Sequence, residues 1–402
     1  MSDDRRVIAR TETATAFRDM PRLWLLLGNR HGDNAQVLAL GESLRESFGW
    51  RGEIKQLSYD PDCTIPFRER GASLIGLDQS DGMPLVAPWP DIIIAIGKSA
   101  ASVVRWIDLQ AGGNAICILL GRPRTAYHHF DLLVTTPQFS MPPGDNVIRL
   151  TMPITLQDET KLAAEAAYWQ QRLSHLPRPW TAVLIGGDTA QLSFDAASAK
   201  QLNDRLVQYQ KQHGGSLLIS TSPRTPKDVG DLLEREMPQP HYFFRWKKDA
   251  DNPYHAFIAL ADNFIVTNDS VTMIAEAADR VRPIFLYPLP RRELEPGGPW
   301  NELNRHLRRR RERRKNAGLR RDLIDRLFDL MTESGHLRPR NNIESFEATL
   351  YSQGVARPLG ESGQRPWAAD SVTKIERNVV TERIYDLWKR KLSAKGAIKT
   401  AE

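Results

Sequence analysis

Residues 252–288 constrain the fold more than any other part of the chain. They read as helix, strand, tight loop, helix and strand, because an apolar, β-branched run at 264–267 precedes the polar loop 268–270 and the small residues of 271–278. A helix that begins just beyond the carboxyl end of a buried strand presents free N–H groups and the positive end of its dipole. Such a turn can bind phosphate, although many α/β proteins contain similar turns.

The same unit of apolar strand, small or polar loop and helix recurs along the chain. Strands are predicted in the first half at 23–27, 54–57, 91–96, 115–120 and 132–135. Strands are predicted in the second half at 182–185, 216–221, 242–246, 264–267 and 284–287. We therefore expect an α/β protein with two tandem Rossmann-like domains that face a central cleft at the carboxyl ends of their strands.

Domain boundaries follow from this alternation. The polar residues 1–20 are expected to form a flexible N-terminus, and the proline-rich stretch 176–179 breaks the chain after a predicted helix. The first domain is therefore predicted at 21–175 and the second at 176–340. Beyond them, 341–402 is predicted to be an extension with a helix at 372–388 and a disordered tail from residue 391.

Several function classes find no support in the sequence. No run of about 18 apolar residues suggests a membrane span, and the N-terminus lacks the apolar core of a signal peptide. Cys63 and Cys117 are far apart and the adjacent His128 and His129 diverge, so neither a disulfide framework nor a metal site is predicted. This usage fits the cytoplasm.

Two glycine-containing loops do not match nucleotide-binding fingerprints. The loop that begins at Gly28 lacks the spacing G-x-G-x-x-G, so no NAD site is predicted. Gly97-Lys98-Ser99 resembles the end of a P-loop, but Ile92 stands where the first glycine should be, which argues against ATP.

The positive charge of the chain is concentrated in one segment. Residues 305–321 contain ten basic residues and one acid, so this segment carries +9 whereas the whole chain carries +6. Three interpretations remain: a solvated charged helix or loop, a contact with an anionic membrane surface, or nucleic-acid binding. The last is disfavoured because no aromatic residues are interleaved with the arginines.

Four motifs together resemble the mitochondrial fission (elongated-mitochondria) family and its bacterial relatives. They are the loop Gly32–Gln36, Ile185-Gly186-Gly187, the stretch from Pro253 through Thr267–Ala277, and 335–339. The resemblance covers roughly 22–340 and implies a GT-B fold like that of nucleotide-sugar glycosyltransferases. The arginine-rich insert departs from it. A plant branch of the family is associated with recruiting a dynamin-related protein to mitochondria.

The resemblance implies a donor site on the second domain. Backbone N–H groups at the start of helix 271–278 would hold a diphosphate, a carboxylate one turn inside would accept ribose hydroxyls, and a basic residue would neutralise phosphate. No metal is needed if the helix dipole and this basic residue stabilise the leaving diphosphate, so no metal and no cofactor besides the nucleotide-sugar substrate are expected. The implied donor-side residues are Gly187, Arg224, Trp246, Ser270, Val271, Thr272 and Glu276.

Glycosyl transfer also needs a base that deprotonates the acceptor, and this group should come from the first domain. Asp33 is the first candidate and His31 the second, although Asp33 could merely cap its helix. Lys98 and Arg122 lie on the same rim and could contact an anionic acceptor.

We therefore predict a metal-independent glycosyltransferase that transfers sugar from a nucleotide sugar to an envelope glycolipid or polysaccharide, in the cytoplasm at the inner membrane face. The alternatives are a non-catalytic scaffold that recruits a protein partner and a nucleotide-sugar epimerase. The sequence leaves the sugar, the acceptor, the stereochemical outcome and the oligomeric state open.

Overall fold

The structure is a computed structural model. It describes residues 20–66, 69–78, 84–292, 306–307, 310–311, 313–314, 320, 322–337, 341–361, 367–368 and 370–399. The flexible segment expected at 1–20 lies outside the described residues, apart from Met20, and so does most of the arginine-rich segment.

The first half of the chain forms a six-stranded parallel sheet with the order β2-β1-β5-β6-β7-β8. Its strands are β1 (Leu23–Leu27), β2 (Gly52–Gln56), β5 (Ile92–Ile96), β6 (Ile116–Leu120), β7 (Leu132–Thr135) and β8 (Val147–Arg149). Helix α2 (His31–Phe48) follows β1 and helix α3 (Gly97–Gln110) follows β5. A short antiparallel pair, β3 (Ser58–Tyr59) and β4 (Leu77–Asp78), lies in the loop region between β2 and β5.

The second half forms another six-stranded parallel sheet, with the order β11-β10-β9-β12-β13-β14. This is the strand order of the doubly wound dinucleotide-binding fold. Its strands are β9 (Trp180–Leu184), β10 (Ser216–Ser220), β11 (His241–Phe244), β12 (Asn263–Thr267), β13 (Ile284–Tyr287) and β14 (Arg357–Pro358). Its helices are α5 (Ala196–His213), α6 (Lys227–Glu236), α7 (Tyr254–Leu260), α8 (Val271–Ala278) and α11 (Ile343–Ser352).

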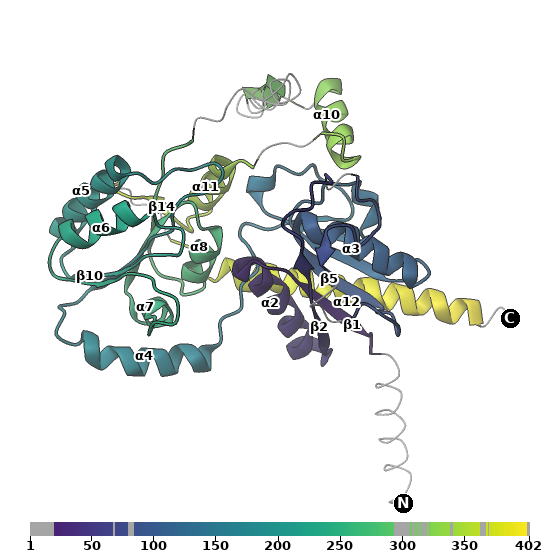
Figure 1. Ribbon diagram of the computed structural model, residues 1–402, viewed down its shortest axis with the longest axis horizontal. Helices are drawn as coiled ribbons and strands as arrows, with labels where there is room; N and C mark the ends of the chain where they lie inside the picture. The colour runs from purple at the N-terminus through teal and green to yellow at the C-terminus, as the bar shows by residue number, and fades with distance from the viewer. Residues whose placement is uncertain are drawn as a thin grey trace, which may run out of the picture.

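Each sheet is buried on both faces, as an all-parallel sheet requires. Alternate residues of β9 and β12 enter two separate clusters: Leu184 and Val266 pack on one side, Val183 and Ile265 on the other. The first sheet is divided in the same way, with Leu25 on one face and Trp24 on the other. The prediction of an α/β protein with two tandem Rossmann-like units is therefore confirmed (Figure 1).

The C-terminal helix α12 (Val372–Lys399) returns from the second sheet to the first. Val380, Ile384 and Trp388 pack into the core of the first sheet on the same face as α2, and the Tyr385 ring stacks on Phe48 at 4.2 Å. The prediction of a disordered tail from residue 391 is wrong as far as residue 399, because the helix continues there.

The predicted extension 341–402 is also not a separate appendage. Its helix α11 contributes Phe346 and Leu350 to the core of the second sheet, and β14 pairs with β13. Two further helices of the described residues are α4 (Glu159–Leu173), which precedes β9, and α10 (Leu323–Glu333). Among the described helices, none combines the length and apolar content needed to cross a bilayer.

Candidate functional site

Each sheet has one position where the strand order reverses. In the first sheet it lies between β1 and β5, and in the second between β9 and β12. At such a point the loops after neighbouring strands diverge, which opens a crevice at the carboxyl ends of the strands where α/β proteins bind ligands. The motifs singled out in the sequence, Gly28–Asn34, Gly97–Ser99, Ile185–Asp188 and Asn268–Ser270, follow these four strands.

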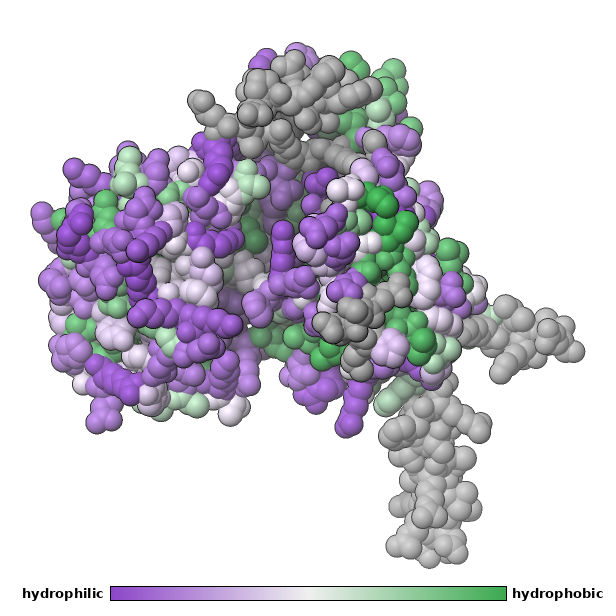
Figure 2. Space-filling model, viewed as in Figure 1, coloured by the Kyte–Doolittle hydropathy of each residue, from purple (hydrophilic) through white to green (hydrophobic). Residues whose placement is uncertain are grey.

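The two switch points face each other. A Cβ atom built at Gly32, in the first turn of α2, would lie 3.2 Å from the Thr272 hydroxyl in the first turn of α8. Figure 1 shows these two helices lying together where the two halves meet, and Figure 2 shows a furrow in the surface between the halves. A group bound at one switch point is therefore within reach of residues at the other.

The helices that begin at the switch points lack a side-chain cap, a feature that they share with α6 and α7. The N-cap residues of α2, α3 and α8 make no side-chain hydrogen bond to their own helices. By contrast, an Asp or Asn side chain caps α4, α5, α10 and α11. The first N–H groups of an α-helix have no intrahelical acceptor, so the uncapped ends keep these donors for another partner.

The α8 end carries three of the predicted donor-side residues. Ser270 is the N-cap, and Val271 and Thr272 are the first two helical residues. All three are half-buried. The helix starts where the sequence predicts it, and three N–H groups with one hydroxyl are positioned to receive an anion.

A buried carboxylate joins the loops beside this helix end. The Asp269 side chain has no exposed surface. It accepts hydrogen bonds from Gly187 N–H at 2.9 Å, from the Thr267 hydroxyl at 2.6 Å and from Arg224 Nη2 at 2.8 Å. Burial raises the pKa of Asp269, and these three donors oppose the rise. Asp269 therefore fixes the relative positions of three loops that follow β9, β10 and β12.

This arrangement also involves Gly187, one of the predicted donor-side residues. Its N–H is already bonded to Asp269, so it does not supply a hydrogen bond to a ligand. Glycine is needed there for another reason: a Cβ would overlap the backbone carbonyl of Arg224. Arg224 itself keeps 45% of its side chain exposed while it pairs with Asp269, which leaves part of its guanidinium open toward solvent.

Glu276 lies one turn inside α8 from Thr272, as predicted. Its Oε2 accepts a hydrogen bond from the Tyr254 hydroxyl at the start of α7. Burial raises the pKa of Glu276, the Tyr254 hydrogen bond opposes the rise and the charge of Asp279 adds to it. Tyr254 lies next to Pro253 in one of the four motifs, but the sequence does not indicate its role, because its partner is 22 positions away.

Trp246 lies just after β11 at the edge of the second sheet. Its backbone N–H donates to the Thr221 hydroxyl at 2.9 Å, and its side chain is 37% exposed. Three strand spacings separate β11 from β12, so Trp246 stands roughly 14 Å across the sheet from the α8 end. It could contact only a distant part of a ligand held at α8.

Asp33 and His31 lie in the first turn of α2, which begins at His31 and not after residue 36. The N-cap residue is Arg30, so Asp33 does not cap the helix. Burial raises the pKa of Asp33, and the Arg30 charge lowers it in part. The adjacent Asn34 fixes the preceding loop, because its side-chain amide exchanges two hydrogen bonds of 2.8 Å with the backbone of Gly28.

Basic residues gather on the rim of the first sheet. Lys98 is exposed in the first turn of α3. Partial desolvation and the charges of Arg124, Arg30 and Arg70 nevertheless lower the pKa of Lys98. Arg30 follows β1, Lys98 follows β5 and Arg124 follows β6, so three adjacent strands direct cations to one edge. The sequence analysis identified only Lys98 of this group.

Arg122 does not belong to this open rim. Its Nη1 donates to the Phe139 carbonyl at 2.7 Å and its Nη2 to the Asn341 side chain at 3.3 Å. Burial lowers the pKa of Arg122 to about 10. In the structure Arg122 ties the first sheet to the segment after α10, and its contact with an acceptor stays a prediction.

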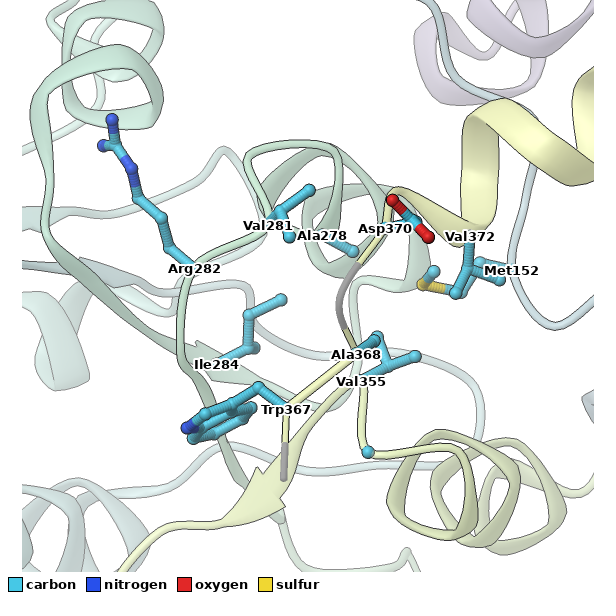
Figure 3. A pocket seen from close by; sticks show the side chains of 11 residues that line it. Met152, Ala278, Val281, Arg282, Ile284, Val355, Trp367, Ala368, Asp370 and Val372 are labelled. Carbon is cyan, nitrogen blue, oxygen red and sulfur yellow. The ribbon is translucent and has the colours of Figure 1, made fainter. Parts of the chain in front are cut away.

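Two cavities lie away from these residues. One of about 20 Å³, large enough for a single water, is lined by Met152, Ala278, Ile284, Trp367 and Asp370 at the opposite end of α8 (Figure 3). The other, of about 350 Å³, is lined by His128, His129, Asp131 and Cys117 among others. No group of three or more potential metal ligands occurs among the described residues.

Comparison with known proteins places the chain in a family. The family model described as "Mitochondrial fission ELM1" matches residues 31–313. The Mitochondrial fission protein ELM1 of Arabidopsis thaliana is 28% identical over 219 residues, which are 49% of this chain and 51% of that protein. The chain thus spans about half of the length of this curated relative.

Solved structures of similar fold are more distant in sequence. A putative UDP-N-acetylglucosamine 2-epimerase from Listeria monocytogenes is 11% identical, with a TM-score of 0.44, and the match covers 83% of this chain and 95% of that one. A family 9 glycosyl transferase from Veillonella parvula is 12% identical, with a TM-score of 0.35, and covers 68% and 82%. Because the family model matches well over half of the residues, the chain belongs to the mitochondrial fission ELM1 family.

Proposed function

We propose that this protein is a GT-B-type glycosyltransferase that moves a sugar from a nucleotide-sugar donor to an envelope glycolipid or polysaccharide. The observation that carries the proposal is the approach of Gly32 to Thr272, which sets the first turn of α2 against the first turn of α8. A sugar held through its diphosphate at α8 would then have the Asp33 carboxylate on its other side.

The second sheet would bind the donor. The diphosphate would accept hydrogen bonds from the N–H groups of Ser270, Val271 and Thr272 and from the Ser270 hydroxyl. The half-exposed Arg224 guanidinium would stabilise the negative charge that develops on the leaving diphosphate. Glu276 would accept a ribose hydroxyl through the carboxylate oxygen that Tyr254 does not engage.

The first sheet would bind the acceptor. Asp33 would deprotonate the attacking hydroxyl, and its raised pKa suits a general base better than that of an ordinary carboxylate. His31 is the second candidate for this role. The cations on the rim, among them Lys98 and Arg30, favour an acceptor that carries phosphate or another anionic group. We propose that the protein works in the cytoplasm at the inner face of the membrane, where such acceptors are embedded.

One observation favours the alternative of a non-catalytic scaffold. Arg224 and Asp269 neutralise each other without a ligand, so the donor side is electrostatically satisfied as it stands. A site that requires no ligand for its stability could persist after catalysis has been lost. Experiment must therefore separate binding from turnover.

Binding is tested by thermal unfolding in the presence of UDP-, GDP-, ADP- and CMP-sugars. One of them should raise Tm by roughly 3–5 °C at a concentration of about 100 times its Kd. Glu276→Gln should lose most of that shift, because its amide still accepts from Tyr254 but offers a weaker acceptor to a ribose hydroxyl. Glu376→Gln is the matched control, since Glu376 is also a carboxylate whose pKa burial raises, but it binds the backbone of Thr151.

Turnover is tested by release of the free nucleotide, a nucleoside diphosphate or, from a CMP-sugar, CMP, from the selected donor in the presence of a membrane glycolipid extract. Asp33→Asn should keep the thermal shift and lower the rate by about 10²–10⁴-fold. A shift without any turnover would support the scaffold. No shift with any nucleotide sugar would reject the donor site altogether.

A further inference from the structure

Helix α10 exposes an apolar stripe that no described part of the chain covers. Leu323, Ile324, Leu327 and Leu330 are 80%, 47%, 55% and 61% exposed. At 100° per residue these four side chains fall within an arc of about 120° on one side of the helix. Figure 2 shows apolar side chains at this tip of the molecule. Isolated apolar side chains are common on surfaces, but four on one face of an 11-residue helix form a continuous patch.

The opposite side of α10 is charged and internally neutralised. Asp322, Asp325 and Asp329 lie there, and arginines of the 305–321 segment pair with them. Arg311 Nη1 lies 2.6 Å from Asp329, and Arg314 Nε lies 3.5 Å from Asp325. These ion pairs hold the acidic side of the helix against its own chain. The apolar side is thereby directed outward.

The helix stands apart from both sheets, at the edge of the first one (Figure 1). Its C-terminal end is attached by Gly335, where a Cβ would lie 2.9 Å from the backbone of Thr125, and by the buried Leu337. Thr125 follows β6 on the rim that also carries Arg124. The apolar stripe is therefore tethered next to the edge where the proposed acceptor would bind.

Cations border the stripe. Arg326 lies on α10 at one margin of the apolar arc and is exposed, and the described residues Arg313 and Arg320 of the preceding segment are exposed as well. The segment 305–321 carries +9 and residues 322–333 carry −3, so the stretch 305–333 keeps a net charge of +6. A convex apolar ridge with a cationic border matches the interface of an anionic bilayer, where leucines enter the acyl region and arginines contact lipid phosphates.

We propose that α10 is an interfacial membrane helix, which inserts Leu323, Ile324, Leu327 and Leu330 into an anionic lipid surface and so presents the rim of the first sheet to membrane-embedded acceptors. The presentation of the rim to membrane-embedded acceptors rests on the proposed function, whereas the insertion of α10 itself does not. A bilayer is favoured over a protein groove because the positive charge in this part of the chain matches an anionic surface.

The test is sedimentation of the full chain with vesicles that contain about 30% phosphatidylglycerol in phosphatidylcholine. We expect the wild type to bind them and the double variant Leu327→Ser/Leu330→Ser to bind at least about tenfold more weakly. Leu109→Ser is the matched control, since Leu109 is 61% exposed like Leu330 but lies on α3. All of these side chains are solvent-exposed, so the variants should fold, and an unchanged Tm confirms it.

A second arm tests the charge. Arg326→Gln should weaken binding to anionic vesicles by about fivefold, and added salt should do the same. Binding that is equal in the double variant and the wild type, or equal on vesicles without phosphatidylglycerol, would overturn the proposal. A third result would also overturn it: a wild type that binds no vesicles but forms a concentration-dependent dimer, which the double variant does not form. That result would assign the apolar stripe to contact with a second copy of the chain. The vesicle experiment contains no nucleotide sugar, so a negative result says nothing about the proposed donor site. Equally, a negative thermal-shift result with nucleotide sugars says nothing about membrane insertion of α10.

Discussion

At the switch point of the second sheet, Asp269 is fully buried and accepts three hydrogen bonds, and Glu276 is bonded to Tyr254. At the switch point of the first sheet, Arg30 and Lys98 are exposed, and their charges repel one another. The first arrangement fixes loops in one geometry, which suits a ligand group that is always the same, such as a diphosphate. The second concentrates exposed positive charge at one edge of the sheet, which suits anionic ligands that vary in shape.

The largest expected effect that separates the two edges is on stability. Asp269→Ala leaves the Gly187 N–H, the Thr267 hydroxyl and Arg224 without their partner, and it should lower the free energy of unfolding by about 3 kcal/mol. Asp33→Ala at the other edge should change it by less than about 1 kcal/mol. Urea denaturation measures both. Similar losses in the two variants would contradict the conclusion that only the switch point of the second sheet is held by a buried carboxylate.

Replacing a glycine by alanine should also destabilise the protein more at the switch point of the second sheet than at that of the first. Gly187→Ala forces a Cβ into the Arg224 carbonyl and should cost about 2–3 kcal/mol. Gly28→Ala, in the loop after β1, meets only the edge of the Tyr59 ring at 3.3 Å and should cost less than about 1 kcal/mol. The same denaturation series compares the two. A harmless Gly187→Ala would mean that the loop after β10 is free to move.

The titration of Glu276, at the switch point of the second sheet, gives a third test. The pKa of Glu276 is raised above its ordinary value of 4.5 by burial, so the native state holds this proton more tightly than the unfolded state. Its contribution to stability is full below pH 4.5 and is lost as the pH rises through the raised pKa. The stability of the wild type relative to Glu276→Gln should therefore fall with rising pH above 4.5. A flat difference would show that the carboxylate is solvated.

The smallest expected effect is at Lys98. Because neighbouring arginines and burial already disfavour its charge, Lys98→Gln should leave the free energy of unfolding within about 0.5 kcal/mol of the wild type. It should also weaken the binding of anions, measured as a smaller Tm increase with inorganic phosphate at low salt. A marked loss of stability would show that Lys98, like Asp269, stabilises the loops around it, and the two switch points would then not differ in this respect.

Much of the fold was predictable because burial on both faces gives parallel strands a continuous apolar pattern. The predicted bounds of β1, β7, α8 and β13 coincide with those observed. Two strands of the large sheets were missed: β8 and β14 are only three and two residues long and lack such a pattern, since β8 ends in Arg149 and β14 contains Pro358. The two-residue strands β3 and β4 were missed as well. Strands this short are defined by their neighbours and not by their own sequence.

The site was predictable to the extent that it lies on local turns. The positions of Ser270 and Thr272 at a helix N-terminus follow from sequence alone. The bonds from Tyr254 to Glu276 and from Arg224 to Asp269 join residues 22 and 45 positions apart, and no local pattern encodes them. The start of α2 was misplaced because Arg30 is not a typical N-cap residue and Gly32 is a poor helix former.

The return of α12 to the first sheet has a consequence for synthesis. The core formed by β1, β5 and β6 is completed by Val380, Ile384 and Trp388, which are the last part of that core to be translated. Until they emerge from the ribosome, one face of the first sheet has no cover over these positions, although its own strands and α2 are already complete. The second sheet can bury its two faces earlier. The N-terminal half of this protein should therefore be the last to reach its final stability, and the half most in need of protection while the chain is being made.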